Sequence, residues 1–175
     1  MPRLSDPPMT KLSSDMQEIY SRFTSPESYL PATFNVLFTN PAVGSGIALL
    51  KEKIDELDLE PWVTYTVGLT VAHEREDKAL WNSILALARD AGPGEPVIAG
   101  IEAGTGPRGL LPKDGIWIQF TLDVIRGSMK DSTWQATTHL VGDEGAVALA
   151  FTASYFEMIT RLNKTFGLSE NTVLP

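Results

Sequence analysis

KALWNSILALARDAG, residues 78–92, is the stretch that decides the fold of this chain. Its apolar residues recur at steps of three and four, the spacing that places side chains on one face of a helix. This face consists of Leu80, Ile84, Leu87, Ala88 and Ala91, flanked by Trp81 and Leu85, with Lys78, Asn82, Arg89 and Asp90 opposite. Gly92 follows directly and can adopt the positive φ that often ends a helix. We therefore predict a largely buried helix over residues 78–91.

Proline and capping residues divide the rest of the chain into segments of helical length. Pro41 and Pro61 suit the first turn of a helix, and Asn40 can cap the one that follows it. Two capping-box patterns, Ser14 with Gln17 and Ser132 with Gln135, mark further starts. Helices are predicted at residues 16–23, 41–57, 62–74, 96–103, 113–129, 132–140 and 144–166, with a short apolar segment at residues 32–38. The fold is thus predicted to be all-α, a helical bundle in a single domain over residues 1–175.

Two of these segments, residues 62–71 and 115–125, have a composition that also suits strands. Both are rich in β-branched and aromatic residues, which favour strands over helices. Each follows a helix start, extends beyond the length of a typical strand and has no tight hairpin turn beside it. We predict helices at both, with an α+β fold as the alternative.

The segment 144–166 has the clearest helical periodicity. Apolar side chains recur there at steps of three and four, at Val147, Phe151, Tyr155, Ile159, Leu162 and Phe166. Charged residues face elsewhere, at Glu157, Arg161 and Lys164. The pattern predicts one continuous apolar stripe that packs into the core.

The composition excludes several classes of protein. The chain has no cysteine, which excludes disulfides, thiolate metal sites and thiol redox chemistry. Its 14 basic and 22 acidic residues give a net charge of −8, without a basic cluster that would bind nucleic acid. No apolar run is long enough to span a membrane, and the first residues lack the apolar core of a signal peptide. We expect a cytoplasmic protein that binds neither nucleic acid nor membrane.

Four stretches together resemble the carboxymuconolactone decarboxylase and alkylhydroperoxidase-like superfamily. They are MPRL at residues 1–4, FNVLFTNPAVGSG at 34–46, TVGLTVA at 66–72 and LWNSILALARDAG at 80–92. In the last stretch, the spacing of Trp81, Ala88 and Gly92 is similar to that of the family's central helix. The resemblance implies an all-α fold, assembly as trimers or hexamers, and an active pocket beside the central helix near a subunit contact.

The chain departs from this family where the family's chemistry lies. The Tyr-Glu pair before the motif tryptophan becomes Ala79 and Leu80, and the motif histidine becomes Ile84. The redox cysteines of the peroxidase branch would fall near Asp77 and Leu80, and its glutamate near Tyr65. Because thiol exchange needs a thiolate, the peroxidase activity is not implied for this chain.

His73 and Tyr65 are the candidate catalytic residues. His73 lies beside Glu74 and Asp77 in the connection that leads to the central helix, which the resemblance places at the border of the pocket. An imidazole there can act as a general acid or base near neutral pH. The phenol of Tyr65 can donate a hydrogen bond to a carbonyl or enolate oxygen. A helix-capping role for His73 and core packing for Tyr65 are the alternatives.

Further residues are candidate substrate contacts, namely Trp81, Glu74, Asp77, Ile84, Arg108 and His139. Trp81 would line an apolar pocket, and Arg108 in the loop GTGPRGLL would bind a carboxylate through two hydrogen bonds. Core packing for Trp81, an exposed loop position for Arg108 and a helix end for His139 are the simpler roles. The stretches DAGPG and GTGPRG lack the strand–turn–helix setting of a dinucleotide loop, and no metal-binding motif is present. We therefore expect no metal, flavin or nicotinamide cofactor.

Three functions agree with these features. The first is a cofactor-independent lyase or isomerase that acts by proton transfer on a small carbonyl, lactone or polycyclic metabolite. The second is a cofactor-free cyclase of natural-product biosynthesis that mainly folds its substrate. The third is a non-catalytic binding protein. In each case the expected partners are a small molecule and further copies of the chain, as a trimer or hexamer.

Overall fold

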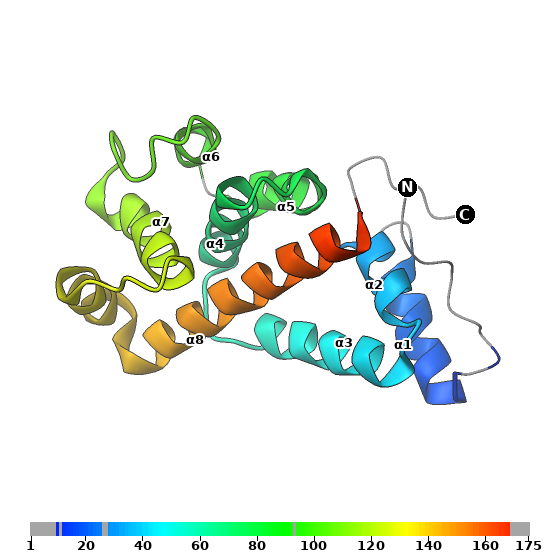
Figure 1. The fold of residues 1–175 in the computed structure, drawn as a ribbon. Helices are drawn as coiled ribbons and strands as arrows, with labels where there is room; N and C mark the ends of the chain where they lie inside the picture. The colour runs from blue at the N-terminus through cyan, green and yellow to red at the C-terminus, as the bar shows by residue number, and fades with distance from the viewer. Residues whose placement is uncertain (1–9, 11, 26–27, 93, 169–175) are drawn as a thin grey trace. The chain divides into compact units, whose positions relative to one another are not determined.

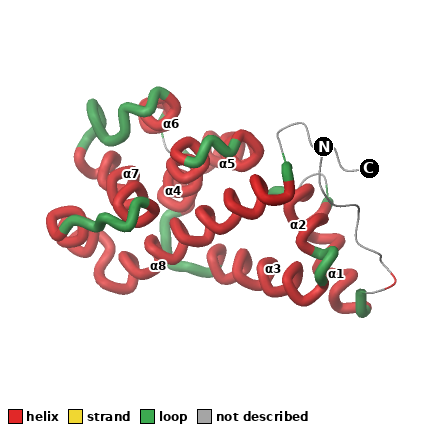
Figure 2. The backbone as a smooth tube through the Cα atoms, in the orientation of Figure 1, coloured by secondary structure: helices red, strands yellow, loops and turns green. Residues whose placement is uncertain are grey.

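The computed structural model describes Thr10 and residues 12–25, 28–92 and 94–168 (Figure 1). This described part consists of helices joined by loops, without strands (Figure 2). The helices are α1 Ser14–Thr24, α2 Pro31–Leu37, α3 Pro41–Asp55, α4 Pro61–Glu74, α5 Lys78–Ala91, α6 Glu95–Glu102, α7 Pro112–Ile125 and α8 Asp131–Phe166. The all-α prediction is therefore confirmed. None of the described helices is both long and apolar enough to cross a membrane. The stretch MPRL lies outside the described residues.

The helices fall into two compact units. The first unit comprises Met1–Glu56 and Arg161–Pro175, and it holds α1, α2, α3 and the end of α8. The second unit comprises Leu57–Thr160, and it holds α4 to α7 with most of α8. Every candidate site residue lies in the second unit. The single domain expected over residues 1–175 stays a prediction.

The first unit has an aromatic core. The rings of Phe23 and Phe34 lie 4.5 Å apart, and Tyr20 meets Phe38 edge-on at 5.4 Å. Gly44 in α3 makes room for one of these rings, because a Cβ there would lie only 2.6 Å from Cγ of Phe38. Helices α1, α2 and α3 pack against one another around these side chains.

Helix α4 is the centre of the second unit, where it packs against α5, α6 and α7 (Figure 1). All residues from 66 to 72 are buried. A helix that is covered on nearly all sides needs apolar residues all round, and this need explains the strand-like composition of residues 62–71. Residues 115–125 are likewise helical, as part of α7. The helix prediction is confirmed for both segments, and the α+β alternative is wrong.

Some helix ends follow the predicted local chemistry. Asn40 caps α3 as expected, because its side-chain oxygen accepts a hydrogen bond from the backbone N–H of Val43. Gly92 follows α5 with a φ of 93°, a left-handed conformation that costs glycine little. Pro41 and Pro61 stand at the first positions of α3 and α4.

Both predicted capping boxes are misplaced, the first by one residue and the second by two. Ser13, and not Ser14, is the N-cap of α1, and its hydroxyl accepts a hydrogen bond from the N–H of Met16. Helix α8 begins at Asp131, which places Ser132 inside the first turn. Neighbouring polar residues offer several similar starts, and sequence spacing does not separate them.

Helix α8 is interrupted at Gly142. The backbone there has a φ of 71° and a ψ of 178°, which no helix accommodates. Glycine reaches this conformation readily, whereas a residue with a Cβ does not. The predicted separation between residues 132–140 and residues 144–166 is therefore real, as a break inside one long element.

The apolar stripe predicted for residues 144–166 is only partly buried. Tyr155 and Ile159 are buried, but Val147 is 64% exposed and Phe151 is 41% exposed. Each four-residue step turns the helix by about 40° beyond a full turn, so a stripe made of such steps winds away from the core. In the first half of this segment the buried apolar residues are Ala146, Leu149 and Ala153. The prediction of a continuous buried stripe was wrong because it gave more weight to large residues than to small ones.

Candidate functional site

Helix α5 packs against α4 through a narrow apolar face. Leu80, Ile84 and Ala88 are buried, whereas Leu87 is 40% exposed and Ala91 is also exposed. One facing helix covers only a stripe of about three positions in two turns. The buried face is therefore narrower than predicted, although Leu80, Ile84 and Ala88 at its centre were predicted correctly.

Ile84 packs into the core between α4 and α5. Its side chain is fully buried. Gly68 of α4 lies opposite, and a Cβ there would be 2.6 Å from Cδ1 of Ile84 and 2.9 Å from Cζ of Phe156. The superfamily that the sequence resembles has a histidine at this position. Here a packed aliphatic side chain occupies it.

The two carboxylates proposed as substrate contacts have structural partners. Asp77 is buried and is the N-cap of α5, where its Oδ1 accepts a hydrogen bond from the N–H of Leu80 at 3.0 Å. Glu74 accepts a hydrogen bond from Nε of Arg126 at 2.9 Å. An aspartate directly before an apolar helical run is a known capping signal, so this role of Asp77 was readable from the sequence.

Arg75 fixes the end of α4 by two further contacts. Its Nε donates to Oε2 of Glu157 at 2.6 Å, and its second guanidinium nitrogen donates to the carbonyl of Ile125 at 2.8 Å. A guanidinium that binds a carboxylate and the last carbonyls of a helix stabilises both. Helices α4, α7 and α8 are joined at this point within the second unit.

His73 is exposed at the end of α4, and its imidazole forms no hydrogen bond with the residues that the structure describes. Its ring centroid lies 6.3 Å from the Trp81 ring, with a tilt of 60° between the planes. The backbone after α6 passes beside it, since a Cβ on Gly104 would lie 3.4 Å from Cε1 of the imidazole. The rings of His73 and Trp81 therefore lie near each other, and the imidazole is exposed.

The other candidates lie apart from His73. Tyr65 is half-buried in α4, roughly 12 Å of helix rise before His73. Arg108 is exposed in the loop between α6 and α7, and His139 is exposed on α8 just before the break at Gly142. The structure describes no hydrogen bond or ring contact from any of them to His73. Among the described residues, no group of three or more imidazole or carboxylate side chains is placed to hold a metal ion.

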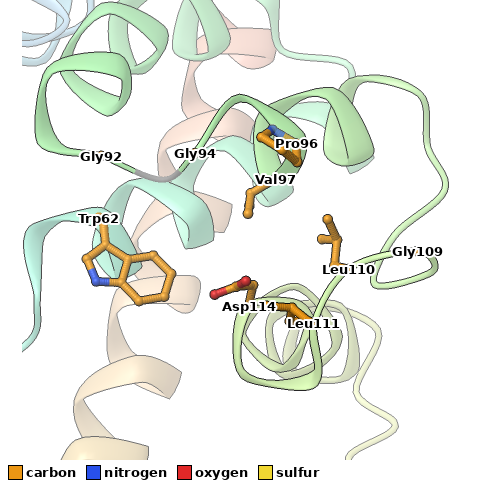
Figure 3. Close-up of a pocket in the computed structure, with 9 residues that line it drawn as sticks. All are labelled: Trp62, Gly92, Gly94, Pro96, Val97, Gly109, Leu110, Leu111 and Asp114. Atoms are coloured by element: carbon orange, nitrogen blue, oxygen red, sulfur yellow. The ribbon is translucent and has the colours of Figure 1, made fainter.

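A cavity of about 330 Å³ opens at the other end of α4 (Figure 3). It lies at the start of α4, the end of α5 and the starts of α6 and α7, and we call it the Trp62 cavity. Its lining consists of Trp62, Gly92, Gly94, Pro96, Val97, Gly109, Leu110, Leu111 and Asp114. Neither His73 nor Trp81 belongs to this lining.

Sequence reasoning missed the Trp62 cavity. Its glycines belong to DAGPG, in which α5 ends as predicted, and to the loop GTGPRG, and both stretches were set aside as cofactor motifs. The signals present were a tryptophan directly after Pro61 and Asp114 in the first turn of α7. Both are ordinary at helix starts, because an acidic residue there also complements the helix dipole.

Comparison with known proteins identifies the fold alone. The sequence matches no family model and no curated protein. The structure is similar to the crystal structure of the debrominase Bmp8 in its apo form, with a TM-score of 0.74 and 9% sequence identity. The match covers 97% of this chain and 93% of that chain. The resemblance to the carboxymuconolactone decarboxylase superfamily stays a prediction.

Proposed function

We propose that this protein is a cofactor-independent enzyme of the lyase or isomerase type that moves a proton on a small carbonyl, lactone or polycyclic metabolite. One observation carries the proposal, the exposed imidazole of His73 near the Trp81 ring and near the backbone of Gly104. Since no described residue forms a hydrogen bond with this ring, its nitrogens remain available to a bound molecule. Histidine is the side chain that most often performs general acid–base catalysis.

The proposed reaction needs no redox partner. Neutral His73 accepts a proton from the carbon beside a carbonyl group, which leaves an enolate and an imidazolium. The imidazolium then returns the proton to a different carbon of the conjugated enolate, so protons and electron pairs balance. Trp81 supplies an apolar surface against which the substrate packs. Glu74 and Asp77 position the helices around this site through Arg126 and through the start of α5.

The likeness to a protein named as a debrominase supports an enzymatic role, because the same fold then carries catalysis in at least one protein. At 9% identity it gives no reason to transfer that protein's substrate to this chain.

The Trp62 cavity favours a second candidate function. A cavity of about 330 Å³ is large enough for a small organic molecule. Because its lining includes neither His73 nor Trp81, a molecule bound there is not in reach of the imidazole. The protein would then bind a small molecule, or fold it for cyclisation, without proton transfer by His73.

We also propose that the chain forms a homo-oligomer, a trimer or a hexamer. Leu140, Val147 and Phe151 of α8 are 50%, 64% and 41% exposed, and subunit contacts commonly bury such side chains. Light scattering should give a multiple of the chain mass, and a monomer mass at micromolar concentration contradicts the proposal. The cytoplasmic location stays a prediction.

Proton exchange at carbon tests the catalytic proposal directly. The protein is incubated in D₂O with a panel of small ketones and lactones, and deuterium incorporation is followed by NMR. We expect incorporation into at least one compound with the wild type, and its loss in His73→Gln. The same substitution at the other exposed histidine, His139→Gln, is the matched control and should retain it. If His73→Gln still exchanges, or if bound compounds never exchange, proton transfer by His73 is wrong and the second candidate stands.

A further inference from the structure

We propose that the Trp62 cavity is a binding site for a small organic cation, with an ammonium group held between Asp114 and Trp62. The site is separate from His73 and goes beyond the function proposed above. Its support comes from the charge and the aromatic surface of the cavity, and from the paired first-turn N–H groups of α6 and α7.

Among the described residues that line this cavity, Asp114 alone has an ionisable side chain. It is half-buried, and no described residue forms a hydrogen bond or ion pair with its carboxylate. The nearby acidic residue Glu95 is already paired with Arg89, at 3.0 Å. Partial burial of a carboxylate that has no cation beside it costs free energy, unless water or a ligand pairs with it.

Trp62 supplies the aromatic surface. Figure 3 shows the Asp114 carboxylate pointing towards the Trp62 indole, with Val97 extending into the same space. The indole is held by an edge contact with Trp117, whose ring centroid is 6.1 Å away at 77°. Trp117 is buried, so this contact fixes the position of the Trp62 ring. Tryptophan is the aromatic side chain that attracts cations most strongly.

Three helices, α4, α6 and α7, begin at the cavity, but the starts of α6 and α7 offer few N–H groups to an anion. Helix N-termini attract anions mainly through backbone N–H groups that lack partners. In α6 and α7, Pro96 and Pro112 have no N–H group. The N–H groups of Val97 and Asp114 already donate to the carbonyls of Gly94 and Leu111, at 2.8 and 2.9 Å. The negative charge that the α7 dipole favours is supplied by Asp114 itself.

The rest of the lining is apolar and selects for a cation with a hydrocarbon part. Val97 is buried, and Leu110 and Pro96 stand on the same side in Figure 3. A compact ammonium group would meet Asp114 and the Trp62 ring, while its carbon chain would pack against these residues. The volume of about 330 Å³ lies at the lower end of the roughly 300–1,000 Å³ typical of ligand pockets, so the ligand is small.

Three compounds of nearly equal shape test the charge of the ligand. Choline carries a quaternary ammonium, 3,3-dimethylbutan-1-ol replaces its nitrogen by carbon, and 3,3-dimethylbutanoate carries a negative charge. Isothermal titration calorimetry with the full chain should show saturable binding of choline, about tenfold tighter than that of the alcohol, and no binding of the carboxylate. n-Butylammonium serves as a second cation for the case that a primary amine is preferred.

Two variants and one control locate the site. Asp114→Asn should weaken choline binding about tenfold or more and leave binding of the alcohol unchanged, because only the charge is lost. Trp62→Leu should weaken the binding of choline more than the binding of the alcohol. Asp131→Asn removes an acidic residue from the first turn of α8, outside the cavity, and should bind choline like the wild type. Circular dichroism should show that all three variants remain helical.

Four results would overturn the proposal. The first is equal affinity for choline and the alcohol, which indicates an apolar cavity without charge selection. The second is tighter binding of 3,3-dimethylbutanoate, which indicates an anion site. The third is an equal loss in Asp114→Asn and Asp131→Asn, which indicates an effect of net charge. The fourth is failure of both choline and n-butylammonium to bind.

Discussion

The two ends of helix α4 use the same kinds of side chain for different purposes. At the C-terminal end, Glu74 and Asp77 each have a protein partner, so these carboxylates hold the structure and leave His73 without a hydrogen bond. At the N-terminal end, Trp62 borders a cavity whose carboxylate, Asp114, has no described partner. The type of a residue near a helix end therefore does not identify a functional group. What distinguishes the two ends is which polar side chains the fold has already used.

The largest expected effect tests whether the C-terminal end is catalytic. His73→Gln should lower the rate of deuterium incorporation by about 10²–10⁴-fold, the usual contribution of a positioned proton-transfer group. Its stability should change little, because the exposed ring makes no described hydrogen bond. NMR rates with the best compound of the panel measure the effect. An unchanged rate would show that the C-terminal end of α4 is not catalytic.

The next prediction concerns the contact of Ile84 in α5 with the middle of α4. Ile84→Ala should lower the free energy of unfolding by about 2–5 kcal/mol, because it opens a cavity where Ile84 meets Gly68. Leu87→Ala, also in α5, is the matched control, since Leu87 is 40% exposed. Urea unfolding followed by circular dichroism measures both. Equal losses in the two variants would show that Ile84 is less tightly packed than its burial indicates.

A smaller effect is expected at the capping carboxylate. Asp77→Ala should cost about 1 kcal/mol of stability, because the N–H of Leu80 loses its acceptor. Asp77→Ser keeps an oxygen that can cap α5 and should recover most of the loss. If the serine variant is no more stable than the alanine variant, capping is not what Asp77 contributes. Asp77 would then need reassessment as a functional carboxylate.

The smallest effect is expected at the ion pair beside His73. Arg126→Gln should change stability by about 0–1 kcal/mol, because both side chains are partly exposed and water screens the pair. The effect should shrink further as salt is added. A loss well above this range, insensitive to salt, would show that the pair is more tightly held than its exposure indicates.

The sequence was sufficient for the fold where local chemistry decides it. Asn40 with Pro41 marks a helix start, Gly92 marks a helix end, and the line through Leu80, Ile84 and Ala88 is the buried face of α5. Each of these signals depends on neighbours within about one or two turns, which a single sequence displays directly. Residues 62–71 were ambiguous because burial on all sides and strand formation select the same residue types.

The site was less predictable because its parts come from distant positions. The lining of the Trp62 cavity is drawn from the boundaries of four helices, and no spacing in the sequence relates Trp62 to Asp114. His73 and Trp81 were found together because a short connection separates them. Tyr65 was grouped with them because of the family resemblance, although roughly two turns of α4 separate it from His73.

The break at Gly142 makes α8 two cooperative elements instead of one. A continuous helix opens as a unit, because each backbone hydrogen bond supports the next. With φ 71° and ψ 178° at Gly142, that support is interrupted between residues 131–141 and residues 143–166. Local opening of the shorter segment, which carries His139, therefore need not spread into the longer one. Backbone amides on the two sides of Gly142 should accordingly exchange with solvent at independent rates.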